Sequence, residues 1–203
     1  MDAAKIRLSP EEAALVVSAD WILTKNRVMQ KAMDMLGLVQ ADQNIHLEKF
    51  KNRLPQAIYQ SSPKIARGEN YLGLPWLMLD FPRSFNREDT FAIRTFFWWG
   101  NFFSVTLHLS GIHKNAYEGA VINNFEKLKS GGFFFCVNTD QWQHHFGSDN
   151  YTATDKIDPD AWPATIGNAD FIKLSKKIPL QDWNEAPQKL LKVYGELLNA
   201  IIV

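Results

Sequence analysis

A run of aromatic residues around a glycine–asparagine pair constrains this chain more than any other part of its sequence. Seven aromatics fall within residues 91–103: Phe91, Phe96, Phe97, Trp98, Trp99, Phe102 and Phe103. Residues 95–113 contain no Asp, Glu, Lys or Arg, and about 20 apolar residues suffice to span a membrane. Gly100-Asn101 interrupts the run, and such a pair is typical of a two-residue hairpin turn. We therefore predict a soluble β-hairpin, not a membrane span.

The predicted hairpin has two unlike faces. Folding the chain about Gly100-Asn101 pairs Trp99 with Phe102, and every second residue along each strand then shares a face. One predicted face is apolar except for a single arginine: Ala92, Arg94, Phe96, Trp98, Phe103, Val105, Leu107 and Leu109. The other mixes aromatic and polar side chains: Phe91, Ile93, Thr95, Phe97, Trp99, Phe102, Ser104, Thr106, His108 and Ser110. We expect the first face to be core and the second to be amphipathic.

Three stretches have the apolar periodicity of amphipathic helices: residues 10–37, 115–128 and 184–202. The first is preceded by Ser9, with Glu12 three residues later, which predicts a capping box. This long helix is expected to end at Gly37, and a break at residues 18–20 is compatible with the pattern. Residues 47–54 are compatible with a short helix.

Apolar runs bounded by glycine and proline predict further strands at 71–81, 133–137 and 171–178. The last is expected to be partly exposed because it carries Lys173, Lys176 and Lys177. Together the patterns predict one α+β domain over residues 1–203: a largely antiparallel sheet of about four or five strands packed by a long N-terminal, a middle and a C-terminal helix. Residues 138–169 are expected to form a long acidic loop. Since the helices can cover only one sheet face, the other needs loops, a partner or a ligand.

Charge and cysteine content limit the partners that the chain is expected to have. It has 22 Lys and Arg against 22 Asp and Glu, and this balance predicts neither nucleic acid nor membrane as a partner. The single cysteine and the polar N-terminal segment predict a cytoplasmic protein.

Arg94 and the aromatic hairpin are the first candidate site. A guanidinium stays charged, so a buried Arg94 needs a carboxylate, first Asp80 and then Glu69, or a bound anion. The amphipathic face, with Phe97, Trp99, Phe102 and His108, is suited to an identical subunit, another protein or a small apolar ligand. Stacking of single-stranded nucleic acid on these rings would need basic neighbours, which the face lacks.

A second candidate site lies in the acidic loop. Asp140, His144, His145 and Asp149 are residue types that bind zinc or iron, and His108 could add a distant ligand. The common nucleotide, hydrolase and metalloprotease motifs are absent from the sequence. We therefore predict a non-catalytic binding or interaction module with no cofactor. The alternative is a metal-assisted hydrolase or related enzyme with a divalent metal in the 138–150 loop, so the sequence leaves open whether the chain is an enzyme.

Overall fold

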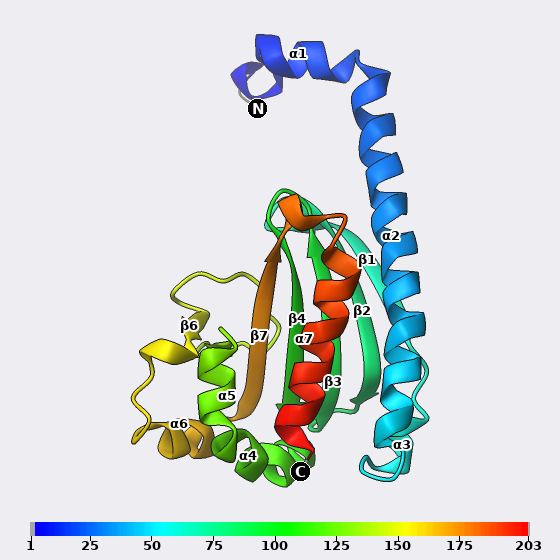
Figure 1. Cartoon of the computed structure of the whole chain (residues 1–203). Coiled ribbons are helices and arrows are strands. Elements are labelled where there is room, and N and C mark those ends of the chain that lie inside the picture. Colours follow the sequence, from blue (N-terminus) through cyan, green and yellow to red (C-terminus); the bar gives the residue numbers. More distant parts are fainter. Residues whose placement is uncertain (1–2, 203) are drawn as a thin grey trace.

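The computed structural model describes residues 3–202 and confirms an α+β architecture. Its antiparallel sheet has the strand order β1-β2-β3-β4-β7-β5-β6 (Figure 1). The strands are β1 Lys64–Tyr71, β2 Leu74–Phe85, β3 Thr90–Trp98, β4 Phe102–Ser110, β5 Phe134–Cys136, β6 Tyr151–Ala153 and β7 Phe171–Pro179. The α-helices are α1 Pro10–Val16, α2 Ala19–Leu47, α3 Gln56–Tyr59, α4 Ile112–Asn123, α5 Phe125–Ser130, α6 Trp162–Asn168 and α7 Ala186–Ile201. Short 3-10 helices are η1 Ala3–Ile6, η2 Glu48–Phe50, η3 Thr154–Lys156 and η4 Leu180–Asp182.

Helices α2 and α7 lie side by side on one face of the sheet, and α4 lies at the end of the sheet (Figure 1). Their apolar stripes meet the inward side chains of the four central strands in one large buried cluster. Leu36 of α2, Leu197 of α7 and Leu107 of β4 are each 0% exposed within it. Burying this much apolar surface is the main favourable term in folding, so this face is the core. None of the helices within residues 3–202 is both long and apolar enough to cross a membrane.

The N-terminal helix begins as predicted but runs ten residues further. Ser9 Oγ accepts from the Glu12 amide at 3.2 Å and Glu12 Oε2 accepts from the Ser9 amide at 2.7 Å, which confirms the capping box. A break at Ser18 separates α1 from α2. The predicted end at Gly37 is wrong. A glycine within a helix costs about 1 kcal/mol, and burial of Val39 and Leu47 against the sheet outweighs it.

The hairpin exists, but its register differs from the prediction by one residue. Trp98 pairs with Phe102 across a three-residue loop in which Gly100 has φ +71°. Because side chains alternate along a strand, one extra loop residue turns every side chain of β4 to the opposite face relative to β3. Phe91, Ile93 and Phe97 therefore join Phe103, Val105, Leu107 and Leu109 beneath the helices. Arg94, Phe96 and Trp98 share the second face with Phe102, Ser104, Thr106 and His108.

The sheet has seven strands, more than the four or five predicted, because two of its strands carry weak signals. β1 lies at the sheet edge and mixes charged and small residues with few large apolar ones, and β6 has only three residues. The expectation that β7 is partly exposed is wrong for Lys173, which is 0% exposed, although Lys177 is exposed. Within 138–169, β6, η3 and α6 lie in the predicted loop. The middle helix is divided at Asn124, whose side chain donates to the Ala120 and Ala200 carbonyls.

Two leucines on α2 allow a matched test of the core. Leu36 is 0% exposed against the sheet, whereas Leu38 is 67% exposed two residues later. Leu36→Ala should lower the free energy of unfolding by about 2–5 kcal/mol because it leaves a cavity, and Leu38→Ala should change it by under about 0.5 kcal/mol. Urea denaturation of both variants checks this. Equal losses would contradict the placement of α2 on the sheet.

Candidate functional site

A row of polar side chains crosses the middle of the second sheet face. In the strand register, Asp80 of β2 pairs with Arg94 of β3, Arg94 with Thr106 of β4, and Thr106 with Ser175 of β7. Thr106 and Ser175 join their hydroxyls at 2.6 Å, and both are buried. His108 and Lys173 occupy the next row. Buried polar groups are thus concentrated on this face, while the helix-covered face buries Gln43 against Thr95.

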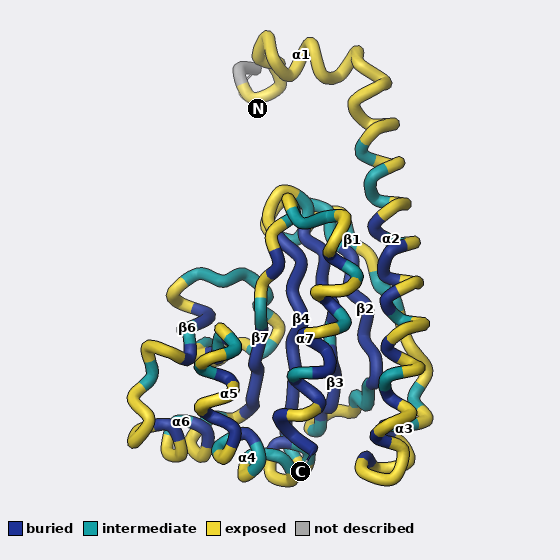
Figure 2. The backbone as a smooth tube through the Cα atoms, viewed as in Figure 1, coloured by how far each residue is buried: buried dark blue, intermediate teal, exposed yellow. Residues whose placement is uncertain are grey.

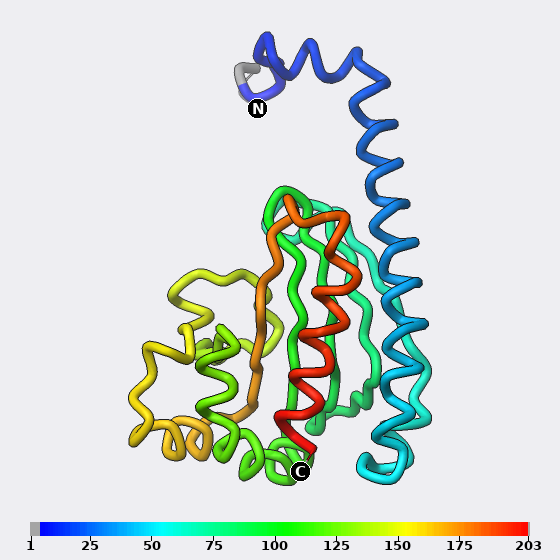
Figure 3. The backbone as a smooth tube through the Cα atoms, viewed as in Figure 1, coloured from blue at the N-terminus to red at the C-terminus, as the bar shows by residue number. Residues whose placement is uncertain are grey.

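The segment from β5 to β6 covers this face, and we call residues 138–150 the cover loop (Figure 3). Polar contacts from three strand side chains, Lys173, His108 and Tyr71, hold it to the sheet. Lys173 Nζ donates to the Gln143 carbonyl, His108 Nε2 lies 2.8 Å from Gln141 Oε1, and Tyr71 Oη accepts from the amides of His144 at 2.7 Å and His145 at 3.0 Å. Phe146 adds an apolar contact, since its ring packs on Phe102, Phe134 and Tyr151. Loops, as predicted among other covers, thus close the second face.

Arg94 forms the ion pair predicted with Asp80. Its Nε donates to Asp80 Oδ1 at 2.8 Å and its Nη2 to Oδ2 at 3.4 Å, with about a tenth of each side chain exposed. The guanidinium carbon lies 5.6 Å from the ring centre of Phe85 and 5.5 Å from that of Trp142 in the cover loop. Nη1 is buried and has no hydrogen-bond partner among the described residues. A buried donor without a partner costs about 1–3 kcal/mol, so Nη1 is an available donor for a ligand.

A pocket of about 230 Å³ opens beside this arginine. It lies between the strands β1, β2 and β3 and the cover loop, and its walls are mostly aromatic. The lining residues are Ala66, Asn70, Tyr71, Trp76, Met78, Arg94, Phe96, Trp142 and His144. Arg94 is the one residue of this lining with a permanent charge. An apolar pocket with a few convergent polar groups is the usual form of a small-molecule site.

The buried titratable side chains on this face have shifted pKa values. Burial, followed by the charges of Arg94 and Lys173, lowers the pKa of His108 to about 3. The same causes hold the pKa of His144 well below its ordinary value. Burial lowers the pKa of Lys173 to about 8, so its ammonium form still dominates at pH 7. Arg94 and Lys173 thus carry two positive charges, and two carboxylates lie near them: Asp80 pairs with Arg94, and Asp140 acts on Lys173.

The predicted metal ligands are not brought together. His108 bonds to Gln141, His144 packs on Tyr71 and Phe96, and Asp140 accepts from the Trp142 amide and the Gln143 side chain. His145 Nδ1 accepts from the Gly147 amide and lies 3.9 Å from Asp149 Oδ1. Across residues 3–202 no group of three or more His, Cys, Asp or Glu side chains is placed to hold a metal ion. Asp149 and His145 form only a pair. His144 does not join them, because adjacent side chains point to different sides of the chain.

The predicted aromatic site is divided between the two faces of the sheet. Phe97 is 1% exposed and packs on Phe103 and Trp183 below α7, and Trp99 packs against the same core. Phe102 and His108 lie on the second face with Arg94. The expectation that Phe97, Trp99 and Phe102 share a face is therefore wrong, because it assumed a two-residue turn.

Sequence reasoning missed Tyr71, Trp76, Trp142 and Lys173 as parts of this site. Asp140 and His144, which lie two residues to either side of Trp142 in the sequence, were predicted as possible metal ligands. Trp142 itself was not predicted to be part of a site. Lys173 occurs in a strand with two other lysines, and alternation places it on the same face as the exposed Lys177, so no local pattern distinguishes the buried lysine from the exposed one. No local pattern links Tyr71 to a loop seventy residues away.

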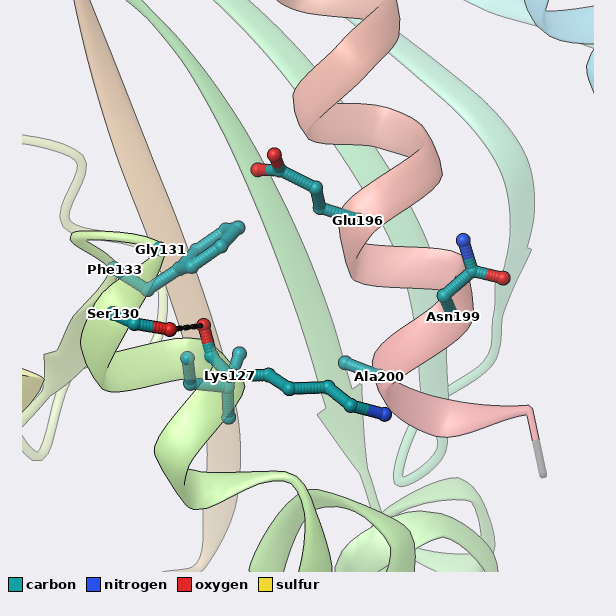
Figure 4. Close-up of a pocket in the computed structure, with 8 residues that line it drawn as sticks. Lys127, Ser130, Gly131, Phe133, Glu196, Asn199 and Ala200 are labelled. Carbon is teal, nitrogen blue, oxygen red and sulfur yellow. Dashed lines mark hydrogen bonds between the residues drawn. The ribbon is translucent and has the colours of Figure 1, made fainter.

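A second cavity, of about 330 Å³, lies between α5 and α7 (Figure 4). Its polar side chains do not converge. The Lys127 amine extends toward Ala200, whereas the Glu196 carboxylate turns away from it toward Phe133 (Figure 4). Glu196 already has Lys176 at 3.5 Å and Lys192 at 3.9 Å. The pocket beside Arg94 is therefore the better candidate site.

Comparison of this chain with protein-family models, curated proteins and solved structures gave no match. The candidate site consequently rests on its own geometry.

Two tyrosines allow a matched test of the cover loop. Tyr71→Phe removes the acceptor of the His144 and His145 amides, whereas Tyr194→Phe removes a buried hydroxyl that has no partner among the described residues. We expect Tyr71→Phe to lower the unfolding free energy by about 1–3 kcal/mol and to speed hydrogen exchange at residues 144–145, and Tyr194→Phe to be neutral or stabilising. Unchanged exchange in Tyr71→Phe would show that the hydroxyl does not hold the loop.

The buried His108 predicts a loss of stability in acid. Its pKa of about 3 in the folded chain lies below the ordinary 6.5, so between these values the unfolded chain binds a proton that the folded chain does not. Stability from this group is therefore complete above pH 6.5 and falls as the pH is lowered toward 3, by up to about 1.4 kcal/mol per pH unit. His108→Gln should reduce this slope in urea titrations at pH 4.5–6.5. Above pH 7 the unfolding free energies of wild type and His108→Gln should depend on pH with the same slope. Equal slopes at pH 4.5–6.5 as well would show that His108 does not cause the loss of stability in acid.

Proposed function

We propose that this chain is a non-catalytic binding module for a small organic anion with a planar apolar body. Its anionic group binds Arg94, and its body packs among Tyr71, Trp76 and Phe96. The observation that carries the proposal is the buried Nη1 of Arg94, a charged donor with no partner within residues 3–202, on a residue that lines an aromatic pocket. A ligand oxygen would remove the cost of this unpaired donor.

A carboxylate fits this position better than a neutral group. Asp80 occupies the Nε side of the guanidinium fork and leaves the Nη1 side for a second acceptor. Hydrogen bonds to a charged partner contribute about 1.5–3 kcal/mol, roughly twice a neutral bond.

The aromatic walls select the rest of the ligand. Trp76 and Phe96 lie 6.3 Å apart between ring centres, and Tyr71 meets Phe96 edge to face at 5.9 Å. At these spacings the rings touch one another and form a continuous aromatic wall, which a planar apolar group can meet by stacked or edge contacts. The volume of about 230 Å³ is that of a small ligand, and a peptide chain would not fit within it.

The cover loop gives the pocket a lid. Trp142 lies against the guanidinium, and Nη1 is covered in this conformation. Of the two rings near the guanidinium, Phe85 and Trp142, only Trp142 belongs to the cover loop, and we infer that it shifts when a ligand reaches Nη1. The loop is held mainly by the Tyr71, His108 and Lys173 contacts, so entry requires a local opening and leaves the sheet intact. The metal-assisted alternative has no triad of ligands among the described residues, and we do not propose it.

Matched pairs of charged and neutral probes test the proposal. Benzoate and indole-3-carboxylate should raise the melting temperature and give saturable heats in calorimetric titration, whereas benzamide and indole-3-carboxamide should do so weakly. Arg94→Lys keeps a charge near Asp80 but removes the fork, and it should weaken carboxylate binding about 10- to 100-fold. Arg83→Lys is the control, since Arg83 lies on the neighbouring strand and bonds the Ser62 carbonyl outside the pocket.

Two results would count against this function. Equal stabilisation by the acids and their amides would show that the negative charge of the ligand does not contribute to binding. Equal affinities in wild type and Arg94→Lys, with Trp76→Ala also unchanged, would place any binding elsewhere.

A further inference from the structure

The N-terminal part of the chain leaves the body of the protein and exposes an apolar surface. We call residues 5–24 the arm; it includes α1 and the first turns of α2. All twenty of its residues are exposed, and Figure 2 shows it as a continuous exposed segment that projects beyond the sheet. Its large exposed apolar residues are Ile6, Leu8, Leu15, Val16, Val17, Trp21, Ile22 and Leu23, with exposed fractions from 47% to 82%.

The arm continues the same helix stripe that builds the core. In α2, Leu36, Val39 and Leu47 face the sheet, and Met29 packs against the core where the sheet ends. Trp21 and Ile22 lie seven residues before Val28 and Met29, which is two helical turns on the same side. The stripe thus extends past the sheet and ends without a cover within residues 5–202.

The charge of the arm does not suit a membrane or a nucleic acid. Lys5 and Arg7 stand against Glu11, Glu12 and Asp20, a balance of −1. α1 carries two acidic residues in its first turn and no basic residue in its last. Helices that lie on anionic membranes have a basic polar face, and nucleic-acid binding needs accumulated positive charge. Another protein surface therefore fits the arm better.

The size of the arm suits one side of a symmetric dimer. An interface of standard size takes about 20–30 residues from each partner, and the arm supplies twenty. A two-fold interface uses the same patch on both subunits, so the patch must complement itself. The arm does so, because it combines apolar residues with nearly balanced charges of both signs.

We propose that the arm is the dimerisation surface of this protein and that its occupant is the arm of a second copy of the chain. The two arms exchange about a two-fold axis, and α1 of each copy covers the exposed start of α2 of the other. Leu15, Val16 and Ile22 are buried in the contact. The pocket beside Arg94 has no part in the interface, so this inference does not depend on the ligand.

Sedimentation analysis of the full chain at 1–100 µM tests the proposal. Wild type should dimerise in this range. Leu15→Glu combined with Ile22→Glu should raise the dimer dissociation constant at least about 100-fold, because charges replace central apolar contacts. The control combines Leu38→Glu and Ile45→Glu, which change side chains 67% and 68% exposed on α2 outside the arm, and it should dimerise as wild type does.

Hydrogen exchange identifies the surface independently of the variants. Amides in residues 5–24 should exchange more slowly at 100 µM than at 1 µM in wild type and the control, and equally fast at both concentrations in the arm variant. A monomeric wild type at 100 µM, or a dimer that forms without protection of the arm, would overturn the proposal. So would a monomeric wild type that co-sediments with phosphatidylcholine–phosphatidylglycerol vesicles, since a lipid surface would then cover the arm.

Discussion

The buried ion pair between Arg94 and Asp80 is the interaction on which the second face of the sheet depends. It joins two central strands in register, and the hydroxyls of Thr106 and Ser175 continue its row. Removal of one partner from such a pair costs about 3–5 kcal/mol because the other charge stays buried alone. The guanidinium also supports the ring of Trp142, so the position of the cover loop is tied to the pair. Charge, loop and pocket therefore form one unit.

The two faces of the sheet are closed by different physical means. On one face, α2 and α7 bury leucine, valine and phenylalanine side chains in a packed apolar core. On the other, a loop with little regular structure is held by backbone and side-chain hydrogen bonds and by aromatic contacts. Contacts of the second kind open at lower cost than a packed core. Access for a ligand is therefore expected on the loop side.

The sequence predicted the parts of this fold that local patterns encode. The capping box at Ser9 and Glu12, the C-terminal helix and the existence of the hairpin follow from short-range signals. The length of the hairpin loop does not, because Gly100-Asn101 is compatible with turns of two or three residues. That single residue decides which aromatics accompany Arg94, and it moved Phe97 from the candidate site into the core. Lys173 and Tyr71 enter the site through strand pairing and a distant loop, which periodicity does not report.

Strand β1 forms one edge of the sheet, and its composition limits how two sheets can meet. Lys64, Arg67 and Glu69 are exposed along it, and Glu69 pairs with Lys25 of α2. Charged side chains on an outer strand disfavour the addition of a further strand from another molecule. Gly68 brings a further restriction, because the ring of Trp76 occupies the space where a side chain would stand. Lateral growth of the sheet is thus disfavoured at this edge, and so is a filament that would begin there by strand addition.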